Sequence, residues 1–252
     1  MRGFGMALAA VIGLLVTGCE QLKLATFSME GKKPDESRVL AIGHGVEWEF
    51  RWVPAGKLQA SGASPVEIAD GFWIGADLVT EADWQKVMGK PPSFQASPTA
   101  KGRSPANPEA RVSWHDSQAF LGRLISPHPD WKYELPDVAA WEFACRAGSV
   151  PVASGFPEYG AKSNLGNAGN AWSIRNMRSN AGEWCRDSVS PDLGRFTVRS
   201  AGGRGSGFQL QRFSKIGFRV ALVRNESPGP KPAAPISESL PAGLSDSASN
   251  RP

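Results

Sequence analysis

The segment from Val46 to Trp52 alternates apolar and charged side chains without a break, and this pattern limits the fold more than any other. Successive side chains of a β-strand point to opposite faces, so strict alternation predicts a strand with one buried face. That face is expected to carry the apolar residues of the segment, which are Val46, Trp48, Phe50 and Trp52. A Gly-Phe-Trp-Ile-Gly run at 71–75 predicts a second, short strand.

Three short helices are predicted after these strands, because three N-cap signals each precede an amphipathic stretch. Thr80 and Ser113 are each followed three residues later by an aspartate, which is a capping-box pattern. Asp137 is the expected N-cap of the third helix, and Gly148 marks its end. The segment 216–223 predicts one closing strand, whereas the rest of the second half is rich in glycine, asparagine and serine. Short strands, short helices and long loops together indicate an α+β domain.

The chain divides into four predicted parts. Residues 1–19 indicate a signal peptide, because Arg2 precedes an apolar run that is too short for a comfortable membrane span. Residues 20–44 are polar and unpatterned and predict a tether, and residues 45–224 hold a single domain. Residues 225–252 predict a disordered tail of proline, serine and alanine, because they cannot bury enough apolar surface to offset the entropy of ordering.

The signal peptide ends in Val-Thr-Gly followed by Cys19, which is similar to the bacterial lipobox. In such signals the cysteine thiol is lipidated and becomes the mature N-terminus, so acyl chains hold the protein on a membrane. The alternative is an ordinary cleaved signal peptide that happens to contain a cysteine. Because Glu20 rather than aspartate follows Cys19, the outer membrane, facing the periplasm, is the favoured location for an exported, lipid-anchored chain.

Charge and cysteine content narrow the function further. The net charge is +4, but lysine and arginine are scattered, with no run longer than Lys32–Lys33, so no nucleic-acid partner is expected. If Cys19 carries lipid, Cys145 and Cys185 remain. An exported compartment permits a disulfide between them, and two free buried thiols are an equally good interpretation.

Seven short phrases follow one another in an order that resembles the formylglycine-generating enzyme, or sulfatase-modifying factor, family. The most similar phrase reads Trp-Glu-Phe-Ala-Cys-Arg-Ala-Gly at 141–148. The family fold resembles a C-type lectin core, which agrees with the loop-rich α+β domain predicted above. The seven phrases are Trp52–Gly56, Phe72–Gly75, Pro92–Phe94, Val112–Trp114, Trp141–Gly148, Glu183–Cys185 and Ile216–Arg219.

The resemblance does not extend to the catalytic centre. The family enzyme oxidises a substrate cysteine to formylglycine with two cysteines that hold copper, before the closing Ile-Gly-Phe-Arg strand. The corresponding stretch here, Arg199–Lys215, contains neither cysteine nor histidine. Copper(I) needs soft thiolate ligands, so copper is not expected and no catalytic residue is assigned.

A structural calcium ion is the cofactor that the resemblance still implies. Its ligands would be the side chains of Asn176 and Glu183 and the carbonyl groups of Ser179 and Ala181, all hard oxygen donors. A hydrogen-bonded loop without metal is the alternative, since Gly182 stands where the family has tryptophan. Arg219, in the closing strand, is expected to form a structural ion pair.

Two functions remain after this comparison. The first is a non-catalytic, lipid-anchored binding or structural module at the cell envelope, whose partner is an envelope or extracellular protein or glycan. The second is a protein-modifying oxidoreductase of the formylglycine-generating type with an altered active site. That enzyme would need a pocket of converging polar groups near residues 199–214.

Overall fold

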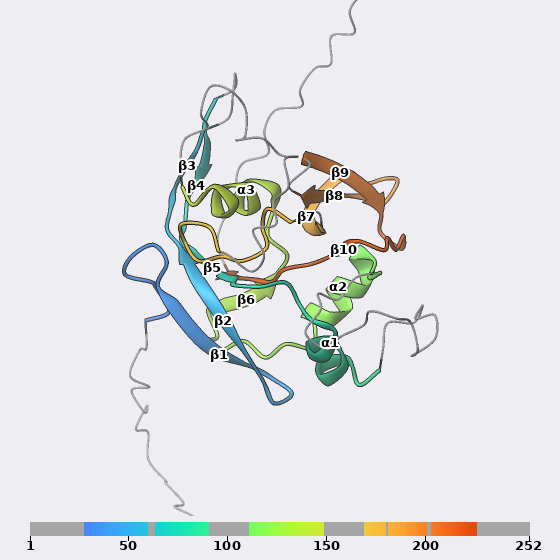
Figure 1. Ribbon diagram of the computed structural model, residues 1–252, viewed down its shortest axis with the longest axis horizontal. Coiled ribbons are helices and arrows are strands. Elements are labelled where there is room, and N and C mark those ends of the chain that lie inside the picture. The colour runs from blue at the N-terminus through green and yellow to red at the C-terminus, as the bar shows by residue number, and fades with distance from the viewer. Residues whose placement is uncertain are drawn as a thin grey trace, which may run out of the picture.

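The computed structural model describes residues 28–59, 64–90, 111–148, 169–179, 181–200 and 203–225 (Figure 1). The expected lipidation site, Cys19, lies outside these residues, as do the signal peptide and all of the predicted tail except Asn225. The described strands form a five-stranded, a four-stranded and a two-stranded sheet, with three short helices between them. This arrangement confirms the predicted α+β class.

The five-stranded sheet forms the centre of the molecule and is antiparallel throughout. Its order is β1-β2-β5-β11-β6, so the last strand of the chain lies between two earlier ones. The predicted alternating strand is β2, in which Phe50 is fully buried and Trp52 is 4% exposed. The five strands are β1 (Ser37–Gly43), β2 (Val46–Val53), β5 (Phe72–Gly75), β11 (Ala221–Arg224) and β6 (Trp131–Glu134).

The four-stranded sheet lies to one side of the larger sheet (Figure 1). Its order is β10-β7-β8-β9, with β10 parallel to β7 and the other pairs antiparallel. Its strands are β7 (Gly182–Ser190), β8 (Arg195–Ser200), β9 (Gly203–Phe208) and β10 (Ile216–Gly217). A separate hairpin pairs β3 (Gly56–Leu58) with β4 (Val66–Ile68).

All three predicted helix starts are confirmed. Thr80 caps α1 (Glu81–Met88) and Ser113 caps α2 (Trp114–Leu121), and in both helices the third residue completes a capping box. Asp137 caps α3 (Val138–Arg146) by accepting a hydrogen bond from the N–H of Ala140. This third helix ends at Ala147, which adopts the left-handed conformation with φ +51° one residue before Gly148.

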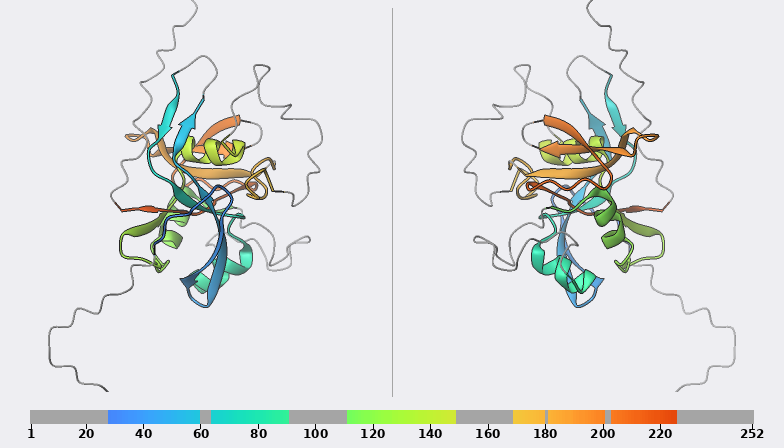
Figure 2. Two further views of the ribbon diagram at one scale, coloured as in Figure 1. Left: turned by 90° about the vertical axis from the view of Figure 1, so that its left-hand side faces the viewer. Right: turned by 90° about the vertical axis from the view of Figure 1, so that its right-hand side faces the viewer.

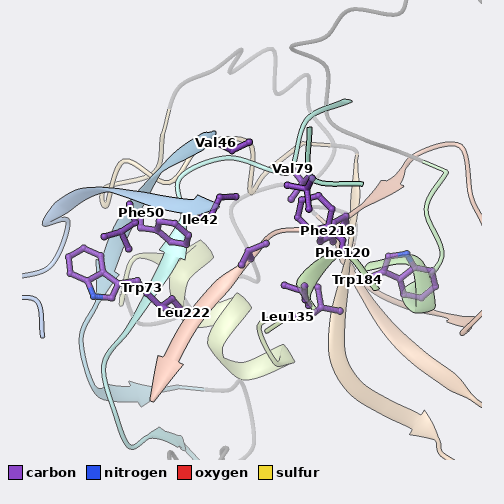
Figure 3. Close-up of a cluster of buried hydrophobic side chains, with 14 of the residues drawn as sticks. Ile42, Val46, Phe50, Trp73, Val79, Phe120, Leu135, Trp184, Phe218 and Leu222 are labelled. Atoms are coloured by element: carbon purple, nitrogen blue, oxygen red, sulfur yellow. The ribbon is translucent and has the colours of Figure 1, made fainter. Parts of the chain in front are cut away.

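Two hydrophobic clusters cover opposite faces of the five-stranded sheet, because neighbouring residues of one strand point in opposite directions. On β5, Trp73 belongs to the cluster that includes helices α1 and α2, whereas Ile74 belongs to the cluster around α3. Figure 2 shows α1 and α3 on opposite sides of the strands. In the first cluster the ring of Phe120 lies 5.4 Å from that of Trp84. It lies 5.3 Å from the ring of Phe218, and Figure 3 shows these two residues together.

The predicted tether over residues 20–44 is wrong for its described part. Met29 is 3% exposed, and its carbonyl oxygen accepts a hydrogen bond of 2.6 Å from the indole N–H of Trp73. Strand β1 then pairs with β2 along its length. The sequence pattern did not predict this strand, because β1 buries only Leu40 and Ile42. Its stability comes mainly from its pairing with β2, which lies further along the chain.

The predicted closing strand over 216–223 is also wrong as one element. It is divided into β10 and β11, which belong to different sheets. The break surrounds Arg219, whose buried guanidinium bonds to Glu183. On either side of it the carbonyl groups of Phe218 and Val220 accept hydrogen bonds from the N–H groups of Val79 and Gly75. These two hydrogen bonds take the place of regular strand pairing between residues 218 and 220.

Candidate functional site

A buried ion pair occupies the junction of the two sheets. The guanidinium of Arg219 donates to both carboxylate oxygens of Glu183, at 3.0 and 3.1 Å, and the indole N–H of Trp141 adds a third bond at 2.8 Å. Arg219 is fully buried and Glu183 is 1% exposed. Arg219 also donates to the carbonyl groups of Gly75 and Arg175. The predicted structural role of Arg219 is therefore confirmed: it joins β7, α3 and the end of β5.

The residues predicted to bind calcium lie in and just after the turn that enters β7. Asn176 has φ +63°, its carbonyl accepts from the N–H of Ser179, and its side-chain amide approaches Asp77 at 3.4 Å. The hydroxyl of Ser179 accepts a bond from the N–H of Ala181. Glu183 already uses three of its roughly four lone-pair directions, so it fits a cation only through the remaining one.

No group of three or more histidine, cysteine, aspartate or glutamate side chains suited to a metal occurs in the described part of the chain. A calcium loop built largely from carbonyl groups does not need such a group. The calcium site therefore stays a prediction.

The two core cysteines are free thiols in the structure. Cys145 lies on α3 and Cys185 on β7, and they are 1% and 0% exposed. Burial raises the pKa of the Cys185 thiol well above its usual range, and the carboxylates of Asp187 and Glu183 add to this effect. Cys185 is therefore an uncharged thiol at neutral pH. Of the two interpretations of this pair, the structure corresponds to separate buried thiols.

The stretch that would carry a family active site, Arg199–Lys215, is held by structural contacts. The guanidinium of Arg199 pairs with Glu142 at 3.1 Å and lies over the ring of Trp141, so it joins β8 to α3. Arg212 pairs at 2.8 Å with Asp116, the third residue of α2, which completes the capping box with Ser113. Through these ion pairs, α3 is bound to β8 and α2 is bound to the segment that follows β9.

A cleft of about 350 Å³ lies away from that stretch. Arg175 lies at its margin, donating to Asp77 at 2.6 and 2.8 Å and to Glu49 at 2.8 Å. Four carboxylates and one guanidinium line the cleft. Burial acts to raise the pKa of Glu49, but hydrogen bonds from Arg175 and Ser37 and two nearby guanidinium charges outweigh it and lower the pKa. The lining residues are Glu47, Trp48, Glu49, Gly75, Asp77, Leu78, Val79, Thr80, Asp83, Arg175 and Val220.

The titratable side chains that line this cleft are four carboxylates and one guanidinium. Among the described residues that line it there is no cysteine, histidine or lysine. No local sequence pattern identifies this cleft, because its residues come from β2, the turn after β5, the start of α1, and the separate positions Arg175 and Val220. The available signal was the charged face of the alternating strand, which places Glu47 and Glu49 side by side toward solvent.

A family model for the sulfatase-modifying factor enzyme 1-like domain matches residues 47–173, half of the chain. The chain belongs to this family. Among solved structures, Treponema denticola variable protein 1 is 21% identical, with a TM-score of 0.55 over 73% of this chain and 98% of its own. PvdO from Pseudomonas aeruginosa is 19% identical, with a TM-score of 0.57 over 76% of this chain and 99% of its own.

A third solved structure, that of CarF, is 17% identical, with a TM-score of 0.51 over 69% of this chain and 97% of its own. Likeness at this level of identity shows a shared fold, and it confirms the C-type-lectin-like, formylglycine-generating-enzyme-like domain. No curated protein sequence matches the chain. Among the described helices, none has the length and apolar character needed to cross a membrane.

Proposed function

We propose that this sulfatase-modifying-factor domain is a lipid-anchored, non-catalytic binding module of the cell envelope. The observation that carries the proposal is the placement of its thiols. The family chemistry needs two cysteines in the stretch before the closing strand, where this chain has none. The only cysteines of the domain, Cys145 and Cys185, are buried in the core, so neither can serve as an accessible copper ligand or nucleophile.

The binding surfaces that the fold provides support the same proposal. The acidic cleft offers oxygen acceptors to a protein or glycan ligand, and the four-stranded sheet exposes apolar side chains at one end. A calcium ion at Asn176 and Glu183 would stiffen the loop between these regions. Millimolar calcium should then raise the melting temperature relative to excess chelator, and equal melting temperatures would exclude a stabilising calcium site.

An activity assay tests the proposal directly. The full-length chain, loaded with copper, is incubated with a peptide containing Cys-x-Pro-x-Arg, and mass spectrometry follows conversion of the cysteine to the aldehyde. We expect no conversion, while a formylglycine-generating enzyme assayed in parallel converts the peptide. Cooperative thermal unfolding shows that the inactive chain is folded. Conversion by this chain would favour the altered enzyme instead and require a new copper site.

The lipid anchor needs a separate test, because it rests on the sequence around Cys19. Cells grown with an alkyne-labelled fatty acid should incorporate the label into the wild-type chain, and Cys19→Ala should abolish the incorporation. Labelling of the Cys19→Ala variant, or release of the wild-type chain into the soluble envelope fraction, would contradict the anchor.

A further inference from the structure

Strand β9 is an edge of the four-stranded sheet. Its six residues, Gly203–Phe208, are in continuous register with β8, and β8 is the one strand that it pairs with in the described part of the chain. Figure 1 shows β9 as the outermost of the strands β7, β8 and β9. An edge strand presents a row of backbone N–H and C=O groups on its unpaired side.

The register identifies the residues that face this unpaired side. Directly beyond the strand, the N–H of Gln209 donates to the carbonyl of Gly194 at 2.8 Å, so this pair is a hydrogen-bonded one. Hydrogen-bonded pairs alternate with non-bonded pairs in an antiparallel ladder. The three glycines of β9 therefore direct their backbone groups toward β8. Arg204, Ser206 and Phe208 direct theirs outward.

Two of these three outward residues offer open backbone groups. The N–H and carbonyl of Phe208 both bond to Gln211, which closes that end of the edge. Arg204 and Ser206 remain, and they present two N–H and two C=O groups. A Cβ atom added at Gly205, between them, would meet no described atom within 4 Å, so the sheet face is uncovered at this point. Arg204 and Gly205 are exposed, so this part of the strand is accessible to another chain.

The charge beside the edge is uncompensated. Arg195 donates to the hydroxyl of Ser206 at 2.7 Å and lies over the ring of Phe208, and Arg204 donates to the hydroxyl of Thr197 at 3.3 Å. Among the described residues, no carboxylate pairs with either guanidinium. Register places both arginines on the same face of β8 and β9. Two cations therefore lie next to the open ladder.

An apolar patch continues the edge at its closed end. Leu193, Phe208 and Leu210 are 64%, 51% and 62% exposed, and the bond between Gln209 and Gly194 holds their two segments together. Large apolar side chains gathered on the surface in this way mark contact sites.

We propose that the β9 edge binds an extended, acidic segment of a partner protein as an additional strand. This inference rests on the proposed binding function and names the class of its partner. The backbone groups of Arg204 and Ser206 would continue the ladder, acidic side chains would pair with Arg195 and Arg204, and an apolar residue would cover Phe208. A second copy of this chain is a poor occupant, because edge-to-edge pairing would bring like-charged Arg204 side chains together.

A synthetic peptide tests this edge. The probe is a fluorescent seven-residue peptide of alternating glutamate and valine, titrated with the full-length chain in detergent and followed by anisotropy. We expect saturable binding. Methylation of alternate backbone nitrogens should weaken it at least about tenfold, because it removes ladder donors, and lysine in place of glutamate should weaken it similarly. Absence of saturation at millimolar protein, or equal binding of the methylated peptide, would overturn the proposal.

Variants of the chain locate the binding. Ser206→Pro removes an outward N–H without breaking a backbone hydrogen bond to β8, although it also removes the hydroxyl that accepts from Arg195. Arg204→Glu reverses the charge without altering the backbone. Each should weaken binding at least about tenfold, whereas Lys86→Glu, the same charge change on exposed α1, should leave it within about twofold. If Ser206→Pro does not fold, Arg204→Glu decides alone, and unchanged affinity for it contradicts the proposal. Peptide binding and aldehyde formation are independent readouts, so failure here leaves the non-catalytic function standing.

Discussion

The five-stranded sheet and the β9 side of the four-stranded sheet treat their arginines differently. On the larger sheet Arg51 pairs with Asp35 and Glu49, and Arg224 pairs with Glu30, so the guanidinium charge is neutralised within the fold. On the smaller sheet Arg186 and Arg199 also pair with carboxylates, but Arg195 and Arg204 meet hydroxyl groups and a ring instead. At its centre the larger sheet is buried on both faces, where Trp73 and Ile74 of β5 are fully buried, whereas the smaller one exposes Phe208. One region therefore supports the fold, and the other remains available for contacts.

Removing the charge that joins the two regions should have the largest effect on stability. Glu183→Gln leaves Arg219 buried without a counter-charge, and we expect a loss of about 3–5 kcal/mol in the free energy of unfolding, measured by urea denaturation. Glu67→Gln, on the exposed face of β4, is the matched control and should change stability by less than about 0.5 kcal/mol. A small loss for Glu183→Gln would mean that the junction is not what holds the sheets together.

A double variant sharpens this comparison. Replacing Glu183 by leucine together with Arg219 by methionine removes both charges and keeps apolar volume. We expect it to be more stable than either single replacement, because no buried charge is left unpaired.

The segment that precedes the larger sheet should give the next largest effect. Met29→Ala removes a buried side chain from the cluster that contains Trp73, and we expect a loss of about 2–3 kcal/mol by the same measurement. Lys33→Ala, a nearby exposed residue, serves as the control. If Met29→Ala and the wild type have nearly equal free energies of unfolding, residues 28–36 do not contribute to the folded domain and the tether prediction holds for them.

Measuring the free energy of unfolding over a range of pH isolates the contribution of the Asp116 carboxylate, because the packing effects described above do not depend on its charge. Burial acts to raise the pKa of Asp116, but hydrogen bonds from Ser113 and the guanidinium of Arg212 outweigh it and lower the pKa below the usual 3.8. The stability that this carboxylate contributes is therefore present above pH 3.8 and is lost as pH falls through its lowered folded-state pKa. Asp116→Asn should cost about 1 kcal/mol at pH 7. The difference from wild type should shrink in acid, and a constant difference would contradict the lowered pKa.

The exposed end of the smaller sheet should give the smallest effect on stability. Phe208→Ser removes a half-exposed ring and its contact with Arg195, and we expect a change within about 0.5 kcal/mol. Thermal unfolding checks this value. A large loss in the free energy of unfolding would mean that this end of the smaller sheet also stabilises the fold, and the contrast between the two sheets would not hold.

Local sequence patterns predicted much of the five-stranded sheet and of the helices that pack against it. The alternation of β2 identified its buried face, and the capping signals at Thr80, Ser113 and Asp137 identified all three helix starts. These predictions succeed because strand alternation and helix capping depend on residues a few positions apart. The smaller sheet offered no such signal, because its glycine- and serine-rich strands acquire their burial from α2 and α3.

The sequence by itself determined the family, the α+β class, the lack of thiols before the closing strand and the structural role of Arg219. Only the tertiary structure decided that residues 28–43 belong to the fold, that the closing segment divides between two sheets, and that Cys145 and Cys185 are both buried. It also decided which carboxylates share the cleft, and that Arg195 and Arg204 contact hydroxyl groups with no carboxylate partner among the described residues. Burial and charge pairing depend on residues as far apart as Glu49 and Arg175, and no local pattern encodes a contact over that separation.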